Sequence, residues 1–255
     1  MSRTPFIAGN WKMFTTADEC VALCRGVRER IDALAGVEKA VCPPFVHLER
    51  AKAALAGSSI ALGAQNMHWE EQGAFTGEVS PRMLQGLARY VIIGHSERRQ
   101  YFCETDETCN KKLKSALAHQ LTPIFCVGET REEREANRTI EVLTRQVRQG
   151  LDGVAWTDGC VIAYEPVWAI GTGLAATGAQ ANETIGRIRA LVAEIAGAAI
   201  AERTRIQYGG SVKPDNVAEF LGQQEVDGAL AGGASLDADS FAALVRAAAE
   251  IRAKA

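Results

Sequence analysis

Short apolar segments rich in β-branched residues alternate along this chain with longer segments of helical period, and this alternation constrains the fold more than any other feature. The short segments predict eight strands, near residues 5–10, 37–42, 60–65, 90–94, 122–127, 160–165, 205–209 and 226–231. The longer segments predict helices near residues 17–35, 45–56, 80–88, 105–119, 131–149, 179–196, 215–221 and 238–253.

Strict alternation of strand and helix predicts parallel strands joined by right-handed crossovers, with the helices packed on the outside of the sheet. Eight such units in 255 residues suit a closed (β/α)8 barrel formed by residues 1–255 as a single domain. An open doubly wound sheet is the alternative. It tolerates an uneven number of strands or an antiparallel edge, and because the pattern shows neither, we favour the barrel.

The composition argues against a nucleic-acid-binding, membrane or secreted protein. A net charge of −3 offers no excess of positive charge for a nucleic acid, and no apolar run approaches the roughly 18 residues that cross a membrane. The first ten residues, M-S-R-T-P-F-I-A-G-N, lack the apolar block of a secretory signal, so we expect a cytoplasmic protein. The seven cysteines include no C-x-x-C pair and are interpreted as reduced thiols, with Cys20 and Cys24 on one buried helix face.

The densest run of charge, R-E-E-R-E-A-N-R at residues 131–138, mixes both signs on a predicted helix. It is interpreted as a solvated outer face rather than a binding surface.

Two titratable side chains follow predicted strands. Active sites of such barrels form at the carboxyl ends of the strands. Glu165 ends the apolar segment C-V-I-A-Y-E-P-V-W, where loss of solvation would raise its pKa and make it a stronger base, although an ordinary hydrogen-bonded carboxylate remains the alternative. His95 precedes the first turn of a short helix, which disfavours an imidazolium and favours a neutral ring that donates a hydrogen bond to a carbonyl.

Lys12 and Asn10 follow the first strand. Lys12 could neutralise an anionic substrate as a point charge, with Asn10 as a neutral donor beside it. Schiff-base formation by Lys12 is a second possibility, and a surface lysine without a role is a third.

Glycine pairs follow the last two strands, in Y-G-G-S at residues 208–211 and A-G-G-A-S at residues 231–235. Barrels commonly bind phosphate here, because glycine lets successive backbone N–H groups converge on an anion. The loop A-I-G-T-G at residues 169–173 has the composition of a lid, with a stiff start and an apolar tip bearing glycines. Its G-x-G-x-x-A pattern begins too far from a strand to favour a nicotinamide site.

Eight motifs are spread over nearly the whole chain: A-G-N-W-K-M, A-Q-N-M, G-A-F-T-G-E-V-S, Y-V-I-I-G-H-S-E-R-R, P-I-F-C-V-G-E, A-Y-E-P-V-W-A-I-G-T-G, Y-G-G-S-V and D-G-A-L-A-G-G-A-S-L. In this order they resemble the motifs of the triosephosphate isomerase family, a family with the TIM-barrel fold. The resemblance implies interconversion of dihydroxyacetone phosphate and D-glyceraldehyde 3-phosphate in glycolysis and gluconeogenesis, without a cofactor or metal. A carboxylate base, a neutral histidine and a closing loop are known features of this family.

The resemblance also implies a role for each matching residue. Glu165 would move the proton, His95 would bond the substrate oxygens, and Lys12 and Asn10 would stabilise the enediolate. Glu97, Ser96 and Cys126 would support these groups from behind, with Cys126 as a packing residue rather than a nucleophile. The phosphate would be held by Gly171, Ser211, Gly232 and Gly233. The lid would comprise Pro166, Val167, Trp168, Ala169, Ile170, Gly171, Thr172 and Gly173.

Members of this family are typically homodimers in which the loop after the third strand enters the partner's site. By motif, Thr76 would lie near the partner's Asn10 and Lys12, with Phe75 and Met13 packed at the contact. Exposed aromatic residues in a long loop favour association independently. The chain departs from the family after the lid, where many members have Lys-Thr-Ala and a later Pro but this chain has Leu174, Ala175, Ala176 and Gly178, so it differs from the family at the hinge of the lid.

Two further functions are compatible with the residues. One is a Schiff-base aldolase that uses Lys12, which borohydride trapping with the phosphorylated ketose would reveal. The other is a catalytically silent phosphate-binding barrel, which the presence of Lys12, His95 and Glu165 together disfavours.

Overall fold

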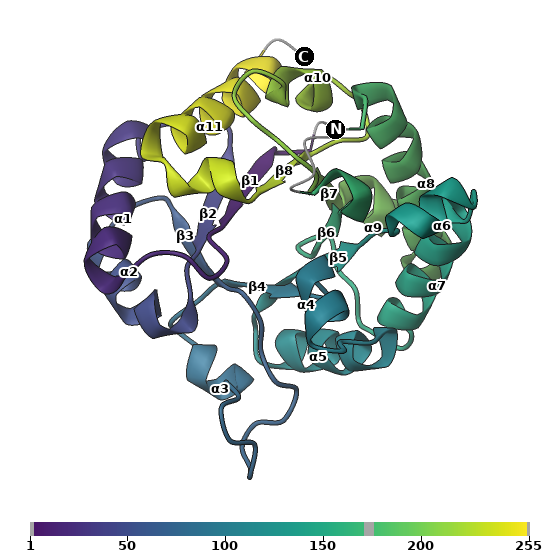
Figure 1. The fold of residues 1–255 in the computed structure, drawn as a ribbon, viewed down its shortest axis with the longest axis horizontal. Helices are drawn as coiled ribbons and strands as arrows, with labels where there is room; N and C mark the ends of the chain where they lie inside the picture. Colours follow the sequence, from purple (N-terminus) through teal and green to yellow (C-terminus); the bar gives the residue numbers. More distant parts are fainter. Residues whose placement is uncertain (1–2, 171–175, 254–255) are drawn as a thin grey trace.

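The strands form a closed barrel. The computed structural model describes residues 3–170 and 176–253, with side chains to residue 251. Eight strands follow one another around the barrel in chain order, and every neighbouring pair is parallel (Figure 1). They are β1 (Phe6–Asn10), β2 (Glu38–Cys42), β3 (Ala61–Ala64), β4 (Tyr90–Ile93), β5 (Thr122–Val127), β6 (Val161–Tyr164), β7 (Arg205–Tyr208) and β8 (Gly228–Ala231). The predicted closed barrel is confirmed, and the open sheet is wrong.

Helices surround the barrel on all sides (Figure 1). The α-helices within the described residues are α1 (Ala17–Ile31), α2 (Leu48–Ala54), α3 (Pro81–Leu84), α4 (Ser96–Tyr101), α5 (Asp106–Ala118), α6 (Arg131–Glu135), α7 (Thr139–Leu151), α8 (Gly178–Ala196), α9 (Ala198–Arg203), α10 (Val217–Leu221) and α11 (Ala238–Ala253). Short 3-10 turns are η1 (Phe45–His47), η2 (Val167–Ala169) and η3 (Gly233–Leu236).

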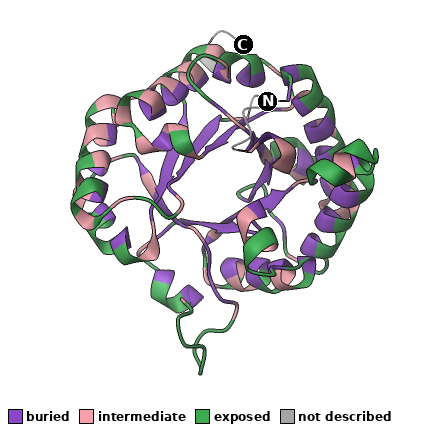
Figure 2. Ribbon diagram, in the orientation of Figure 1, coloured by how far each residue is buried: buried purple, intermediate pink, exposed green. Residues whose placement is uncertain are grey.

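The core has two layers, because alternate side chains of a strand point to opposite faces of a sheet. Ala8 and Ile92 belong to the cluster that fills the barrel, whereas Ile7 and Ile93, their neighbours in sequence, belong to the larger cluster under the helices. Figure 2 shows the same arrangement, with buried strands at the centre and helices that are buried only along their inner sides. Barrel strands buried on both faces explain the nearly continuous apolar runs in the sequence.

Threonine caps begin several of the long helices. Thr16, Thr105 and Thr177 each accept a hydrogen bond from the backbone of the third helical residue, whose side chain returns the bond. Such capping boxes satisfy backbone N–H donors that the helix leaves unpaired, and the capping side chain stabilises the helix by about 1 kcal/mol. They fix where the helix starts, and therefore how long the preceding loop at the end of the strand is.

Some predicted elements are wrong in extent. The predicted helix at residues 131–149 is divided into α6 and α7, since Asn137 adopts a left-handed φ of 57° that no helix accommodates. The sequence pattern also missed α9, which Gly197 separates from α8 with a φ of 94°. The charge run itself is confirmed as largely exposed.

The cysteines fit the expectation of reduced thiols. All seven are free, and Cys20 and Cys24 are both buried on α1. No group of three or more His, Cys, Asp or Glu side chains in the described ranges is arranged to hold a metal ion. In the same ranges, no helix has the length and apolar character needed to cross a membrane.

The loop between β3 and α3 leaves the barrel and projects outward (Figure 1). Most of residues 70–78 are exposed (Figure 2). At its base the ring of His68 stacks on Trp69 at 4.2 Å and lies 4.3 Å from the ring of Phe75. These contacts give the projecting loop an internal apolar support.

Candidate active site

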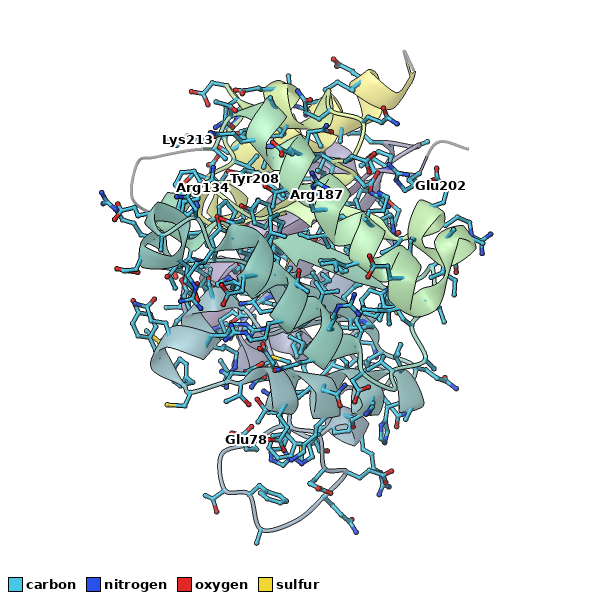
Figure 3. The ribbon with its side chains drawn as sticks, turned by 90° about the vertical axis from the view of Figure 1, so that its right-hand side faces the viewer. Glu78, Arg134, Arg187, Glu202, Tyr208 and Lys213 are labelled. Carbon is cyan, nitrogen blue, oxygen red and sulfur yellow. The ribbon has the colours of Figure 1, made fainter. Side chains whose placement is uncertain are left out.

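A cavity of about 560 Å³ opens at the carboxyl ends of the strands. The ends of β1, β4, β6, β7 and β8 contribute to its wall. It is lined by Asn10, Lys12, His95, Glu165, Ile170, Gly209, Gly210, Ser211, Val212, Lys213, Pro214, Asp215, Leu230, Gly232, Gly233, Ala234 and Ser240. From the side, Lys213 and Arg134, which follow strands, lie at the end of the barrel opposite Glu202, which precedes one (Figure 3). The structure thus brings eight of the predicted site residues to one cavity, the lid residue Ile170 among them.

Glu165 follows β6 and is buried at the floor of this cavity. Its Oε1 lies 2.9 Å from Nε2 of His95, and its Oε2 accepts a hydrogen bond of 2.9 Å from the backbone N–H of Ser96. Both partners come from the turn after β4, 69 residues earlier for Ser96. The carboxylate is therefore held back against the first turn of α4.

The expectation that burial raises the pKa of Glu165 is wrong for this arrangement. Burial does favour the protonated form, but His95, the N–H of Ser96 and the ammonium group of Lys12 together outweigh it and lower the pKa below its ordinary value. The carboxylate is ionised in this position, but its hydrogen bonds make it a weak base.

His95 is the residue directly before α4. Its Nδ1 accepts a hydrogen bond of 3.2 Å from the backbone N–H of Glu97, so in the neutral ring the proton belongs on Nε2, as assigned from this bonding pattern. Burial lowers the pKa of His95, but the carboxylates of Glu165 and Glu97 outweigh it and raise the pKa above its ordinary value. Glu165 is the largest of the effects that raise the pKa of His95, so its departure from this contact would lower that pKa.

Lys12 enters the cavity from the loop after β1 with a left-handed φ of 51°. Its Nζ lies 2.5 Å from Oε1 of Glu97, and its backbone N–H donates to Oδ1 of Asn10 at 3.0 Å. The Nε2 of Gln65 donates to the carbonyl of Lys12 at 2.8 Å and to that of Cys42 at the same distance. Gln65 has no role among the predicted site residues, although its place directly after a strand is a signal that could have indicated one.

The predicted phosphate residues Ser211, Gly232 and Gly233 line the same cavity as Lys12, and a Cβ at Gly232 would lie 3.3 Å from Cε of Lys12. Neither Ser211 nor Gly232 has an acceptor for its backbone N–H among the residues that the structure describes, and both residues line the cavity. Unpaired backbone N–H groups facing a cavity are a common basis for anion binding. The hydroxyl of Ser211 instead donates to the carbonyl of Ala169 at 2.6 Å.

The beginning of the predicted lid is anchored by a buried carboxylate. Trp168 donates from Nε1 to Oε1 of Glu129 at 2.9 Å, and the guanidinium of Arg134 lies 5.3 Å from the indole ring. Glu129, which also accepts from the hydroxyl of Tyr164, was missed as a functional candidate. Pro166, Val167, Ala169 and Ile170 complete the described part of the lid. Gly171, Thr172, Gly173, Leu174 and Ala175 lie outside the described residues.

A second network lies behind His95. The backbone N–H of Gly94 donates to Oε1 of Glu104 at 2.9 Å, and Glu104 also accepts from Lys112 at 2.9 Å and from Arg98 at 2.7 Å. No local sequence pattern indicates this network, since its members come from several turns and helices.

Cys126 lies inside the barrel beneath the cavity, in the same apolar cluster as Ala8. Burial, together with the charge of Glu165, raises the pKa of its thiol well above the ordinary value. A buried thiol of this kind is a poor nucleophile, as expected of a packing residue.

Comparisons with known proteins agree with this architecture. The family model for triosephosphate isomerase matches residues 5–248. The triosephosphate isomerase of Clostridium perfringens (strain SM101 / Type A) is 56% identical over 246 residues, which cover 95% of this chain and 99% of that protein. The triosephosphate isomerase of Carboxydothermus hydrogenoformans is 55% identical over 247 residues, which cover 96% of this chain and 98% of that protein. This chain belongs to the triosephosphate isomerase family.

Proposed function

We propose that this cavity interconverts dihydroxyacetone phosphate and D-glyceraldehyde 3-phosphate, with Glu165 as the base and His95 as the hydrogen-bond donor to the substrate oxygens. The observation that carries the proposal is the contact of 2.9 Å between Oε1 of Glu165 and Nε2 of His95, beside the ammonium group of Lys12. Proton removal next to a carbonyl needs a carboxylate and nearby donors to the oxygens.

The proton transfer uses these groups in sequence. Glu165 removes a proton from C1 of dihydroxyacetone phosphate, the electron pair forms the C1–C2 double bond, and negative charge develops on the C2 oxygen. The Nε2–H of His95, Lys12 and Asn10 stabilise that charge. The hydroxyl proton at C1 moves to the C2 oxygen, and Glu165 returns its proton to C2, which gives the aldehyde.

Substrate must displace Glu165 from its present partners. The substrate oxygen takes the Nε2–H of His95, and the carboxylate loses two of the contacts that lower its pKa, those with His95 and Ser96. Burial then acts on the carboxylate with less opposition and strengthens it as a base. The bonds of Glu165 to His95 and to Ser96 therefore keep the carboxylate a weaker base until substrate replaces them.

The phosphate binds, in this proposal, at the N–H groups of Ser211, Gly232 and Gly233, and Gly171 of the lid adds another. Ser211 also joins this subsite to the lid through its bond to the carbonyl of Ala169. Lid closure around the phosphate excludes water, which protects an intermediate that can otherwise expel phosphate.

A homodimer is part of the proposal. Met13 is 94% exposed and Phe75 is 45% exposed, which is unusual for apolar side chains of this size on a monomer. Thr76 follows Phe75 in the projecting loop and is exposed, and we propose that it meets the partner near the partner's Asn10 and Lys12. Since Lys12 is held in a left-handed conformation, an additional contact from a second copy would help to fix the loop that carries it.

A cytoplasmic location and a role in glycolysis and gluconeogenesis follow from the proposed substrates, because phosphorylated trioses carry charge that prevents them from crossing a membrane unaided.

The test of the proposal is incorporation of solvent deuterium during incubation with dihydroxyacetone phosphate. Label at C2 of glyceraldehyde 3-phosphate and at C1 of recovered substrate is expected, since the base exchanges its proton with water. Product formed without any label, or no product, would contradict it. Borohydride trapping of an adduct on Lys12 would support an aldolase instead, which its contact with Glu97 disfavours.

A further inference from the structure

Asn216 binds both ends of the segment that follows β7. Its Oδ1 accepts a hydrogen bond of 2.8 Å from the backbone N–H of Lys213, and its Nδ2 donates to the carbonyl of Ser211 at 3.1 Å. The backbone N–H of Asn216 also donates to the carbonyl of Lys213 at 3.2 Å. One side chain therefore spans residues 211–213, although it does not itself line the cavity.

The position of Asn216 directly before α10 suggests a helix cap, but its hydrogen bonds exclude that role. A capping side chain accepts from the second or third N–H of the helix that follows it. The carboxamide of Asn216 makes no such bond to α10 and points backward, to the loop between β7 and the helix. Both hydrogen bonds of its carboxamide are made to the segment that carries Ser211.

Hydrogen bonds from a polar residue also hold the backbone of the loop after β8. Ser235 is fully buried, and both its backbone N–H and its hydroxyl donate to the carbonyl of Gly232, at 2.8 Å and 2.6 Å. Each half of the proposed phosphate subsite thus has a polar side chain that fixes its backbone from outside the cavity. Backbone N–H groups bind an anion well only when the peptide planes are held in advance, because ordering them on binding would cost affinity.

We propose that Asn216 is a positioning residue for the phosphate group, which acts by holding the Ser211–Lys213 backbone so that the Ser211 N–H faces the anion. This inference rests on the proposed phosphate role of Ser211. The carboxamide is suited to the task, since it supplies a donor for one carbonyl and an acceptor for one N–H at the same time.

The test compares Asn216→Ala with a matched control, Asn182→Ala. The Oδ1 of Asn182 also accepts a backbone bond, from the N–H of Glu225 at 2.9 Å, but it lies on α8 and does not line the cavity. Three quantities are measured: kcat/KM with D-glyceraldehyde 3-phosphate, the inhibition constant of inorganic phosphate, and the rate of deuterium exchange into D-glyceraldehyde, which lacks the phosphate.

For Asn216→Ala we expect kcat/KM to fall about tenfold and the inhibition constant of inorganic phosphate to rise about tenfold, as the loss of one or two hydrogen bonds predicts. Exchange into D-glyceraldehyde should stay within about twofold of the wild type, because that reaction uses no phosphate contact. Asn182→Ala should leave all three quantities unchanged. Asn216→Asp keeps the acceptor for Lys213, loses the donor for Ser211 and adds negative charge, so it should weaken phosphate binding at least as much.

Unchanged phosphate inhibition in Asn216→Ala would overturn the inference, and so would a parallel loss of exchange into D-glyceraldehyde, which would indicate general disorder of the site. If the alanine variant does not fold, Asn216→Asp carries the same comparison. A wild-type protein that isomerises no triose phosphate would instead refute the proposed function, so the two failures are distinguishable.

Discussion

The Nε2 of His95 and the Oε1 of Glu165 lie 2.9 Å apart, so the donor and the base that the reaction needs on either side of a substrate bind each other. This contact satisfies two buried polar groups and keeps the base ionised. Substrate binding has to break it, and the strength of the base then depends on where the carboxylate moves. Changes to either residue should consequently alter turnover far more than affinity.

Glu165→Asp shortens the side chain by one methylene and retracts the carboxylate from the substrate carbon. We expect kcat to fall at least about 10²-fold with little change in KM, because a displacement of about 1 Å is enough to impair a proton transfer. Steady-state kinetics in both directions measure this. A wild-type rate would show that another group is the base.

His95→Gln removes the imidazole while retaining a side chain that can donate a hydrogen bond. Turnover should fall by about 10²-fold or more, since the amide cannot relay a proton between the substrate oxygens. The circular dichroism spectrum should match that of the wild type. Turnover at the original speed would remove His95 from the mechanism.

Glu104 is expected to stabilise the fold in a pH-dependent way. Burial alone would raise its pKa, but Lys112 and Arg98 outweigh burial and lower the pKa below 4.5. Because the pKa is lower in the folded than in the unfolded chain, the ionised group adds stability that is fully present above about pH 4.5 and is lost as the pH falls through the folded value.

Glu104→Gln should therefore reduce the free energy of unfolding by about 3–5 kcal/mol at pH 7, since it leaves buried Lys112 without its carboxylate partner. Urea unfolding at a series of pH values measures this, and the gap between variant and wild type should narrow below pH 4.5. Glu107→Gln is the control, because its ion pair with Lys111 lies on the surface. Equal effects of the two changes would contradict the prediction.

Lys213 and Asp215 should influence the approach of substrate in opposite directions. Both are exposed at the wall of the cavity, and neither forms an ion pair with any residue in the described ranges. At a separation on the order of 8 Å, Coulomb attraction or repulsion of a dianion predicts that kcat/KM falls about two- to fivefold in Lys213→Met and rises similarly in Asp215→Asn.

Rates measured from about 10 mM to about 500 mM salt provide the check, since screening should bring both variants toward the wild type. Differences that persist at high salt would mean that these residues act by contact rather than through their charge.

Met13→Glu tests whether Met13 lies at an interface between two copies of the chain. On an isolated chain a side chain that is 94% exposed tolerates a charge, whereas at an interface between two copies the buried charge would weaken association. We expect the variant to sediment as a monomer at concentrations where the wild type is a dimer, with lower activity. Ile140→Glu is the control, since Ile140 is a 49% exposed apolar residue on α7, away from the projecting loop. Identical sedimentation of wild type and Met13→Glu would remove Met13 from the interface.

Much of the fold is encoded in local pattern. Strands were predictable because apolar β-branched segments occur at regular intervals, and parallel pairing follows from the helices between them. The same rule places the residues after each strand at one edge of the barrel, so the sequence alone indicated that Asn10, Lys12, His95 and Glu165 share a cavity. The break between α6 and α7 was not predictable, because the left-handed backbone of Asn137 leaves no mark in the charge pattern of residues 131–149.

The order of residues along the chain is enough to specify the barrel, the edge on which the polar residues gather and the family to which the motifs point. The contacts that these residues make with one another depend on the folded chain. The bond from Ser96 to Glu165 and that from Gln65 to Lys12 join segments far apart in sequence, and the first helps reverse the expected shift in the pKa of Glu165. Coulomb and hydrogen-bond energies depend on distances of a few ångströms, which only the folded chain sets.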